Sequence, residues 1–89
     1  MRVNNMLSPS TGKPVANQFL IYADDGAVYF QSYRSIIAKK HLGVTYLDYY
    51  YWDYSRTTGK YRNDFLGENK AETEKKIKAG DYILTDLNP

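Results

Sequence analysis

The chain has 89 residues, of which 43% are hydrophobic and 25% are charged, and its formal net charge is +2. These values are ordinary for a folded protein and exclude a disordered polypeptide, and a chain of this length forms one domain with one modest core. The absence of cysteine and the single histidine, His41, exclude disulfides, thiolate metal sites and multi-histidine metal sites, so we expect no metal and no cofactor.

Turn-forming residues dominate the first sixteen positions, which include Pro9 and Pro14. Proline lacks the N–H group that a central strand donates to its neighbour. Residues 1–16 are therefore predicted to form an irregular N-terminal arm, and residues 17–89 are predicted to form the single domain.

Two β-hairpins are predicted next. The β-prone runs at residues 19–23 and 27–32 flank an Asp-Asp-Gly turn, and Asp-Gly is a strong hairpin signal. The runs at residues 36–38 and 44–47 form a second pair, in which Gly43 permits the positive φ that a tight turn needs.

Residues 49–54 read Tyr-Tyr-Tyr-Trp-Asp-Tyr and have high strand propensity. Side chains alternate between the two faces of a strand, so one buried face cannot hold all of these rings. Some of the rings are therefore expected on the surface or at a partner.

Two short helices are predicted after these aromatic residues. Thr57 or Thr58 can cap a helix over residues 59–66, and a capping box that begins at Asn69 precedes a helix over residues 70–79. A glycine follows each helix, as is common at helix C-termini.

Residues 82–85 return as a last β-prone run. The order of elements predicts an α+β fold with a mainly antiparallel sheet of four to six strands and two short helices before the last strand. Exposed strand edges at residues 27–32 or 82–85 would support a homodimer by strand pairing.

No catalytic constellation is recognisable in the sequence. Asp24 and Asp25 are adjacent turn residues, and His41 follows two lysines. Thr58-Gly59-Lys60 resembles the end of a phosphate-binding loop but lacks the first glycine and the final Ser or Thr of that motif. We therefore expect a non-enzymatic protein. An enzyme whose catalytic residues form no recognisable sequence motif is left open as an alternative.

Basic and aromatic residues are concentrated between Arg34 and Arg62. This segment has six basic and two acidic residues, a net charge of +4, whereas the rest of the chain has six basic and eight acidic residues, a net charge of −2. Tyr, Trp and Arg are enriched at the energetic centres of protein interfaces. Rings interleaved with cations also suit single-stranded nucleic acid, whose bases stack on aromatic side chains.

Two sets of candidate binding residues follow from this segment. The residues expected to contact a partner are Tyr50, Trp52, Tyr54, Arg56, Lys60 and Arg62. The residues expected to contact phosphate are Arg34, Lys39, Lys40, Thr57 and Thr58. The threonines are included because hydroxyls and free N–H groups at the start of a helix attract anions.

Two blocks of the sequence resemble a family of small uncharacterised proteins that are encoded by phages and other mobile elements of Gram-positive bacteria. The blocks are Ser32-Tyr33-x-x-Ile36-Ile37-Ala38 and Trp52-Asp53-Tyr54-Ser55-x-Thr57-Thr58-x-Lys60-Tyr61-x-x-x-Phe65-Leu66. Tyr61 stands where many members of that family have histidine. The resemblance implies an accessory protein in the cytoplasm of a bacterial host, and it brings no established activity.

This setting favours stoichiometric binding over catalysis. We expect a binding protein that antagonises a host defence system, in the manner of an anti-CRISPR inhibitor, by occupying a protein or nucleoprotein surface. The net charge of +2 speaks against an acidic mimic of DNA. A nucleic-acid-binding accessory protein is the alternative, and a structural role in a virion is left open. No apolar run is long enough to span a bilayer, so no membrane partner is expected.

Overall fold

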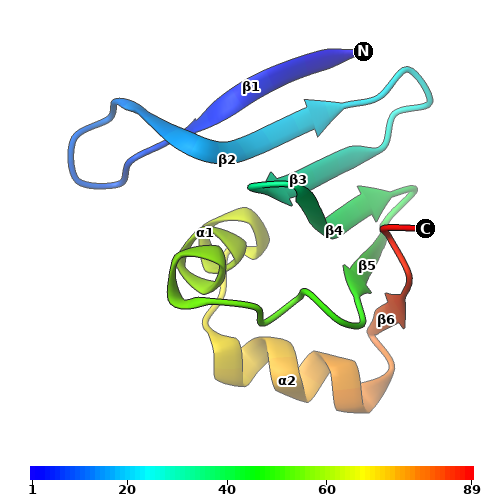
Figure 1. The fold of residues 1–89 in the computed structure, drawn as a ribbon. Coiled ribbons are helices and arrows are strands. Elements are labelled where there is room, and N and C mark those ends of the chain that lie inside the picture. The colour runs from blue at the N-terminus through cyan, green and yellow to red at the C-terminus, as the bar shows by residue number, and fades with distance from the viewer.

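The six strands form one sheet, in which the spatial order of the strands follows their order in the sequence (Figure 1). A computed structural model describes all 89 residues. The elements are Arg2–Leu7 (β1), Pro14–Tyr22 (β2), Val28–Ser32 (β3), Ser35–His41 (β4), Val44–Asp48 (β5), Arg56–Leu66 (α1), Lys70–Ala79 (α2) and Tyr82–Thr85 (β6).

Strands β1 to β5 form an antiparallel meander, and β6 joins β5 in parallel. A parallel neighbour requires a crossover connection of about a dozen residues or more, and residues 49–81, which include both helices, provide it. The predicted α+β fold, with a mainly antiparallel sheet and two helices before the last strand, is confirmed. Both predicted hairpins are present, with Gly43 at a φ of 77°.

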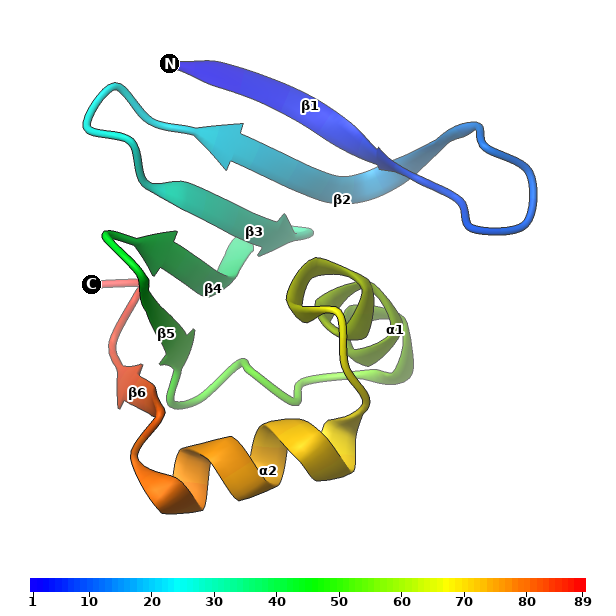
Figure 2. The same cartoon turned by 180° about the vertical axis from the view of Figure 1, so that it is seen from behind.

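Both helices lie on the same side of the sheet, and the other face is not covered by any element (Figures 1 and 2). The hydrophobic core fills the layer between the sheet and the helices. Its buried members are Met6, Phe30, Ile37, Ala38, Leu47 and Tyr61. Phe65 and Leu66 of α1, Ile77 of α2 and Tyr82 of β6 pack against this cluster.

The prediction that residues 1–16 form an irregular arm is wrong. β1 pairs with β2 across Val3–Ile21 and neighbouring positions, and β2 already begins at Pro14. Both prolines avoid the cost of a missing N–H donor, because Pro9 lies in the β1–β2 turn and Pro14 is the first residue of its strand. The sheet therefore begins at β1 and not after residue 16.

The segment predicted to be β-prone at residues 49–54 is a series of turns. The Asp48 carboxylate accepts hydrogen bonds from the backbone N–H groups of Tyr50 (3.1 Å) and Tyr51 (2.8 Å). The Trp52 N–H donates to the Asp48 carbonyl at 3.0 Å. These bonds bend the chain immediately after β5, so local hydrogen bonding to Asp48 overrides the strand propensity of the aromatic residues.

The first helix begins earlier than predicted, because Ser55 and not a threonine is its N-cap. The Ser55 hydroxyl accepts a hydrogen bond from the Thr58 N–H at 3.2 Å. The second helix has the predicted capping box between Asn69 and Glu72. Both helices end at a glycine in the left-handed region, as predicted.

Gly59 is the only glycine of the chain that lies inside a helix, and its φ is not positive. A methyl group added there would lie 3.6 Å from the nearest atom of Arg62, which is an ordinary contact distance. Because glycine costs about 0.5–1 kcal/mol relative to alanine inside a helix, Gly59→Ala is expected to raise the free energy of unfolding by about that amount. Urea unfolding checks this, and a destabilised variant would show that the Arg62 side chain cannot accommodate the methyl group.

Candidate binding site

A cleft of ≈ 570 Å³ lies between the turn that joins β3 to β4 and the start of α1. It is lined by Ser32, Tyr33, Arg34, Ser35, Ile37, Tyr51, Tyr54, Ser55 and Thr57. Two segments that are distant in the sequence, residues 32–37 and 51–57, therefore meet here. Arg34, Tyr54 and Thr57 were predicted as binding residues from the sequence, and the cleft brings these three together.

Tyr33 projects from a two-residue turn, since Ser32 and Ser35 on either side of the turn are paired. Its φ is 57°, in the left-handed region that a tyrosine rarely adopts. The turn is held by a bond from the Tyr33 N–H to the Asn17 carbonyl and by one from the Gln31 amide to the Tyr33 carbonyl, both 2.7 Å long. Strained residues of this kind are concentrated at functional sites. Sequence reasoning missed Tyr33 as a site residue, because only a glycine or asparagine there would have signalled a positive φ.

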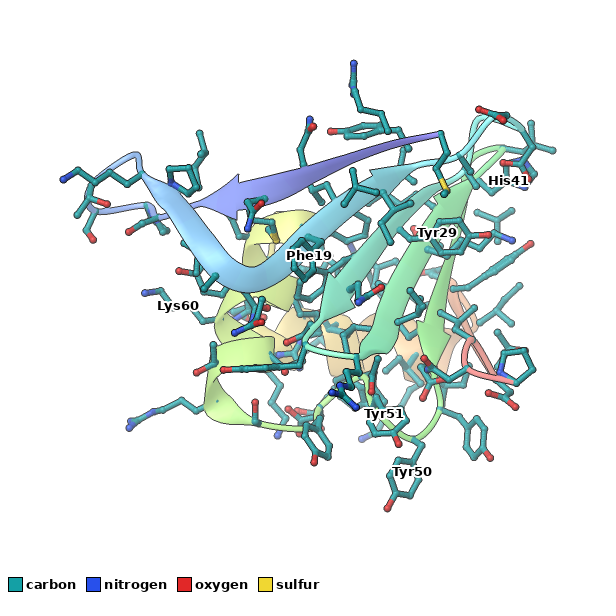
Figure 3. All side chains as sticks on the ribbon, turned by 45° about the horizontal axis from the view of Figure 1, so that its top comes forward. Phe19, Tyr29, His41, Tyr50, Tyr51 and Lys60 are labelled. Atoms are coloured by element: carbon teal, nitrogen blue, oxygen red, sulfur yellow. The ribbon has the colours of Figure 1, made fainter.

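The rings of Tyr51 and Tyr54 form the opposite wall of the cleft, and the ring of Tyr50 packs against Tyr51. The Tyr50 and Tyr51 rings meet edge to face with centroids 4.8 Å apart, and the Tyr51 and Tyr54 rings do so at 5.3 Å. Tyr50 is 69% exposed and Tyr54 is 64% exposed, and Tyr50 projects away from the molecule (Figure 3). The expectation that several of these rings face outward is confirmed.

The start of α1 is electropositive. Its first turn contains no acidic residue, so no side chain of that turn neutralises the positive end of the helix dipole. Arg34, Arg56 and Lys60 are exposed, and none of them belongs to an ion pair. Lys60 extends from α1 into solvent (Figure 3). The cleft therefore combines aromatic walls with hydroxyl groups and free positive charge.

Two residues predicted to bind a partner or phosphate, Arg62 and Thr58, belong instead to the interior, and a third, Trp52, is half-buried. Arg62 is 1% exposed and donates to the Trp52 carbonyl (2.8 Å) and to the carboxylate of Asp53 (3.1 Å). Trp52 is half-buried and packs against the core, with the Arg62 guanidinium 5.2 Å from its ring centroid. Thr58 is fully buried, and its hydroxyl lies 2.8 Å from that of Ser32. The prediction of Arg62 and Thr58 as contact residues is wrong, because sequence spacing does not tell which face of α1 is buried. Trp52 stays a predicted contact residue.

The predicted phosphate-contacting residues do not form one surface. Lys40 lies on the helix-covered side, where its ammonium group donates to the Phe65 carbonyl at 2.7 Å. Lys39 is the next residue along the strand, and its ammonium group lies near the rings of Tyr29 and Tyr46. Adjacent residues in a strand point to opposite faces, so these two lysines cannot act together.

The groups with shifted pKa values lie outside the cleft. Burial of Asp53 raises the pKa of its carboxyl, but hydrogen bonds from Lys70 and Arg62 outweigh this effect and hold the pKa below its usual value. Burial likewise raises the pKa of Glu68, and bonds from Lys76, Thr73 and Tyr82 lower it by more. Both carboxylates are thus held by partners within the fold.

No helix combines the length and apolar character needed to cross a membrane. No group of three or more His, Asp or Glu side chains is arranged to hold a metal ion.

The fold and the cleft define a small α+β protein in which one meander sheet, covered on one face, presents an aromatic and basic cleft at the start of its first helix. The chain belongs to a family of unknown function (DUF8033), whose model matches residues 1–81. No curated protein and no solved structure matches the chain at a significant level.

Proposed function

We propose that this protein is a non-enzymatic binding protein that binds an acidic segment of a partner protein in the cleft beside α1. The observation that carries the proposal is the exposure of Tyr33 and Tyr54 beside Arg34, in a cleft with no unpaired carboxylate among its lining residues. Tyrosine and arginine are the side chains that contribute most at protein interfaces. The cations and the helix dipole favour a partner with negative charge.

We further propose that the partner is a component of a bacterial defence system and that the protein acts in the host cytoplasm on behalf of a phage or mobile element. The resemblance of residues 32–38 and 52–66 to phage-encoded proteins supports this setting. An inhibitor of this kind works by occupying a surface that the host protein needs, so it requires no catalytic group of its own.

Tyr33→Gly provides a sharp test of the cleft. Glycine adopts a φ near 57° without strain, so the free energy of unfolding is expected to change by less than about 1 kcal/mol. The ring is lost, however, and removal of such an interface residue typically weakens binding by about 2 kcal/mol, or roughly thirtyfold. Affinity purification from host lysate, followed by titration of the captured protein, measures this effect.

Lys75→Ala is the matched control, because Lys75 is exposed on α2 and belongs to no ion pair. It should bind like the wild type. Equal affinity of the wild type and Tyr33→Gly for the captured protein would contradict the assignment of the cleft. The proposed antagonism is measured separately, as the plating efficiency of a targeted phage on a host that expresses the wild type or Tyr33→Gly. A plating efficiency that the wild type leaves equal to that on a host without the protein would contradict the antagonism.

A further inference from the structure

The sheet face opposite the helices carries a continuous row of mostly apolar and aromatic side chains. The row crosses all six strands through paired positions, from Val3 to Ile21, Tyr29, Lys39, Tyr46 and Ile83. None of these residues belongs to the hydrophobic core or packs against it. Val3 is 53% and Ile83 is 46% exposed, and the remaining four are half-buried against one another.

A shorter row lies beside the first on the same face. Phe19 is paired with Gln31, which is paired with Ile36. Figure 3 views this face with the helices behind it, and the labelled side chains of Phe19 and Tyr29 lie over the sheet. Neighbouring strands are about 4.8 Å apart, so the face is a platform on the order of 24 Å wide.

Lys39 lies at the centre of this platform. Its ammonium group is 5.5 Å from the Tyr29 ring centroid and 5.4 Å from the Tyr46 ring centroid, so it lies near both rings. It makes no ion pair. A free cation flanked by two aromatic rings offers a contact for phosphate next to two surfaces on which planar groups can stack.

Negative charge is nearly absent from the strands. Of the ten acidic residues in the chain, only Asp48 lies in a strand, and it is 1% exposed and fully hydrogen-bonded within the fold. Of the basic side chains in the strands, Lys39 and His41 lie on this face, whereas Arg2 and Lys40 alternate to the other face. The platform therefore has Lys39 as its central positive charge and no exposed carboxylate in its strands, with Asp25 of the β2–β3 turn as the nearby acidic residue. This charge favours an anionic ligand, and it disfavours a second copy of the same face, which would bring two Lys39 side chains together.

We propose that the uncovered sheet face binds a single-stranded nucleic acid, with bases stacked on Tyr29 and Tyr46 and a phosphate at Lys39. A duplex would not fit this arrangement, because its bases are stacked on one another and are not available to the rings. The site is separate from the cleft at α1, which lies at the helix-covered side of the sheet. A protein with both surfaces can engage a nucleoprotein complex through its protein and its nucleic acid.

Fluorescence anisotropy with labelled oligo-dT, oligo-U and a DNA duplex tests the proposal. The wild type is expected to bind one or both single strands at low salt and to bind the duplex much more weakly. Tyr29→Ala and Tyr46→Ala should each weaken single-strand binding roughly 5- to 100-fold, whereas Tyr29→Phe and Tyr46→Phe keep the ring and should bind like the wild type. Lys39→Ala should reduce the slope of log K against log salt by about 0.7.

Tyr54→Ala and Lys60→Ala are the controls, because they change the cleft side and leave the platform intact. They should bind single strands as the wild type does. The proposal is overturned if the wild type binds no single strand at low salt, if the two control variants lose binding as strongly as Tyr29→Ala and Tyr46→Ala, or if the phenylalanine variants lose it as well. It is also overturned if sedimentation shows a dimer that Tyr46→Ala dissociates, since the platform would then be covered by a second copy.

Discussion

Arg62→Ala is expected to destabilise the protein by about 3–5 kcal/mol, which is a large part of the stability of a small domain. Arg62 is the largest fully buried side chain in the molecule. Its guanidinium group joins the Trp52 carbonyl, the Asp53 carboxylate and the Asn63 side chain, at distances of 2.8, 3.1 and 3.0 Å. Truncation leaves the partly buried Trp52 carbonyl without this donor and removes the packing against the Trp52 ring. Urea unfolding followed by tryptophan fluorescence measures the loss.

Two matched variants make this prediction specific. Arg56→Ala removes an exposed arginine from the same helix and is expected to change stability by less than about 0.5 kcal/mol. Arg62→Lys keeps the charge but lacks the planar fork that reaches three acceptors, so it should recover only part of the loss. An Arg62→Ala protein as stable as Arg56→Ala would show that Arg62 does not organise the turn before α1.

Asp48→Ala is expected to cost about 3 kcal/mol or more, because one buried carboxylate holds two distant segments together. One oxygen accepts from the N–H groups of Tyr50 and Tyr51, and the other accepts from the Leu87 N–H at 2.8 Å and the Asn88 side chain at 3.0 Å. Removal leaves these donors without their acceptor, at about 1–3 kcal/mol for each one that stays buried. Thermal and urea unfolding measure the cost, and Asp64→Asn, at an exposed and unpaired position, is the control.

The same carboxylate makes stability depend on pH. Burial raises the pKa of Asp48, but the bonds from Leu87, Tyr51, Asn88 and Tyr50 outweigh burial and hold the pKa below its usual value. A lowered pKa in the folded state means that the stabilisation is complete above the unfolded value, about 3.9, and is lost as the pH falls through the folded value. The difference in stability between wild type and Asp48→Ala should therefore shrink below about pH 4. A difference that stays constant down to pH 2 would contradict the role of the charge.

Local sequence signals were sufficient for most of the fold. The hairpins follow from β-prone runs separated by turn residues, and α2 follows from its capping box and Gly80. The signals failed where a non-local partner decides the structure. β1 was missed because its segment is rich in turn formers and becomes a strand only through its backbone pairing with β2. Residues 49–54 were misread because hydrogen bonds to the Asp48 side chain redirect the backbone.

The candidate site was predictable in composition but not in geometry. The abundance of tyrosine and arginine between residues 34 and 62 indicated a binding surface, and exposed Tyr50 and Tyr54 agree with it. Burial of Arg62 and Thr58 depends on how α1 is rotated against the sheet, which no local pattern specifies.

The predicted free edge at residues 27–32 is wrong, because these residues belong to β3, which has a strand on each side. The free edges of the sheet are β1 and β6.

The order of strands in the sheet also shapes how the molecule forms during synthesis. Each pairing from β1 to β5 joins neighbours in the sequence, and such local pairings close with little loss of chain entropy. Residues 1–48 can therefore assemble on the ribosome while residues 82–88 are still being made. Until those residues arrive, Asp48 lacks the Leu87 and Asn88 donors and β5 presents an open edge. The nascent meander is thus most exposed to wrong pairing with other chains just before β6 docks.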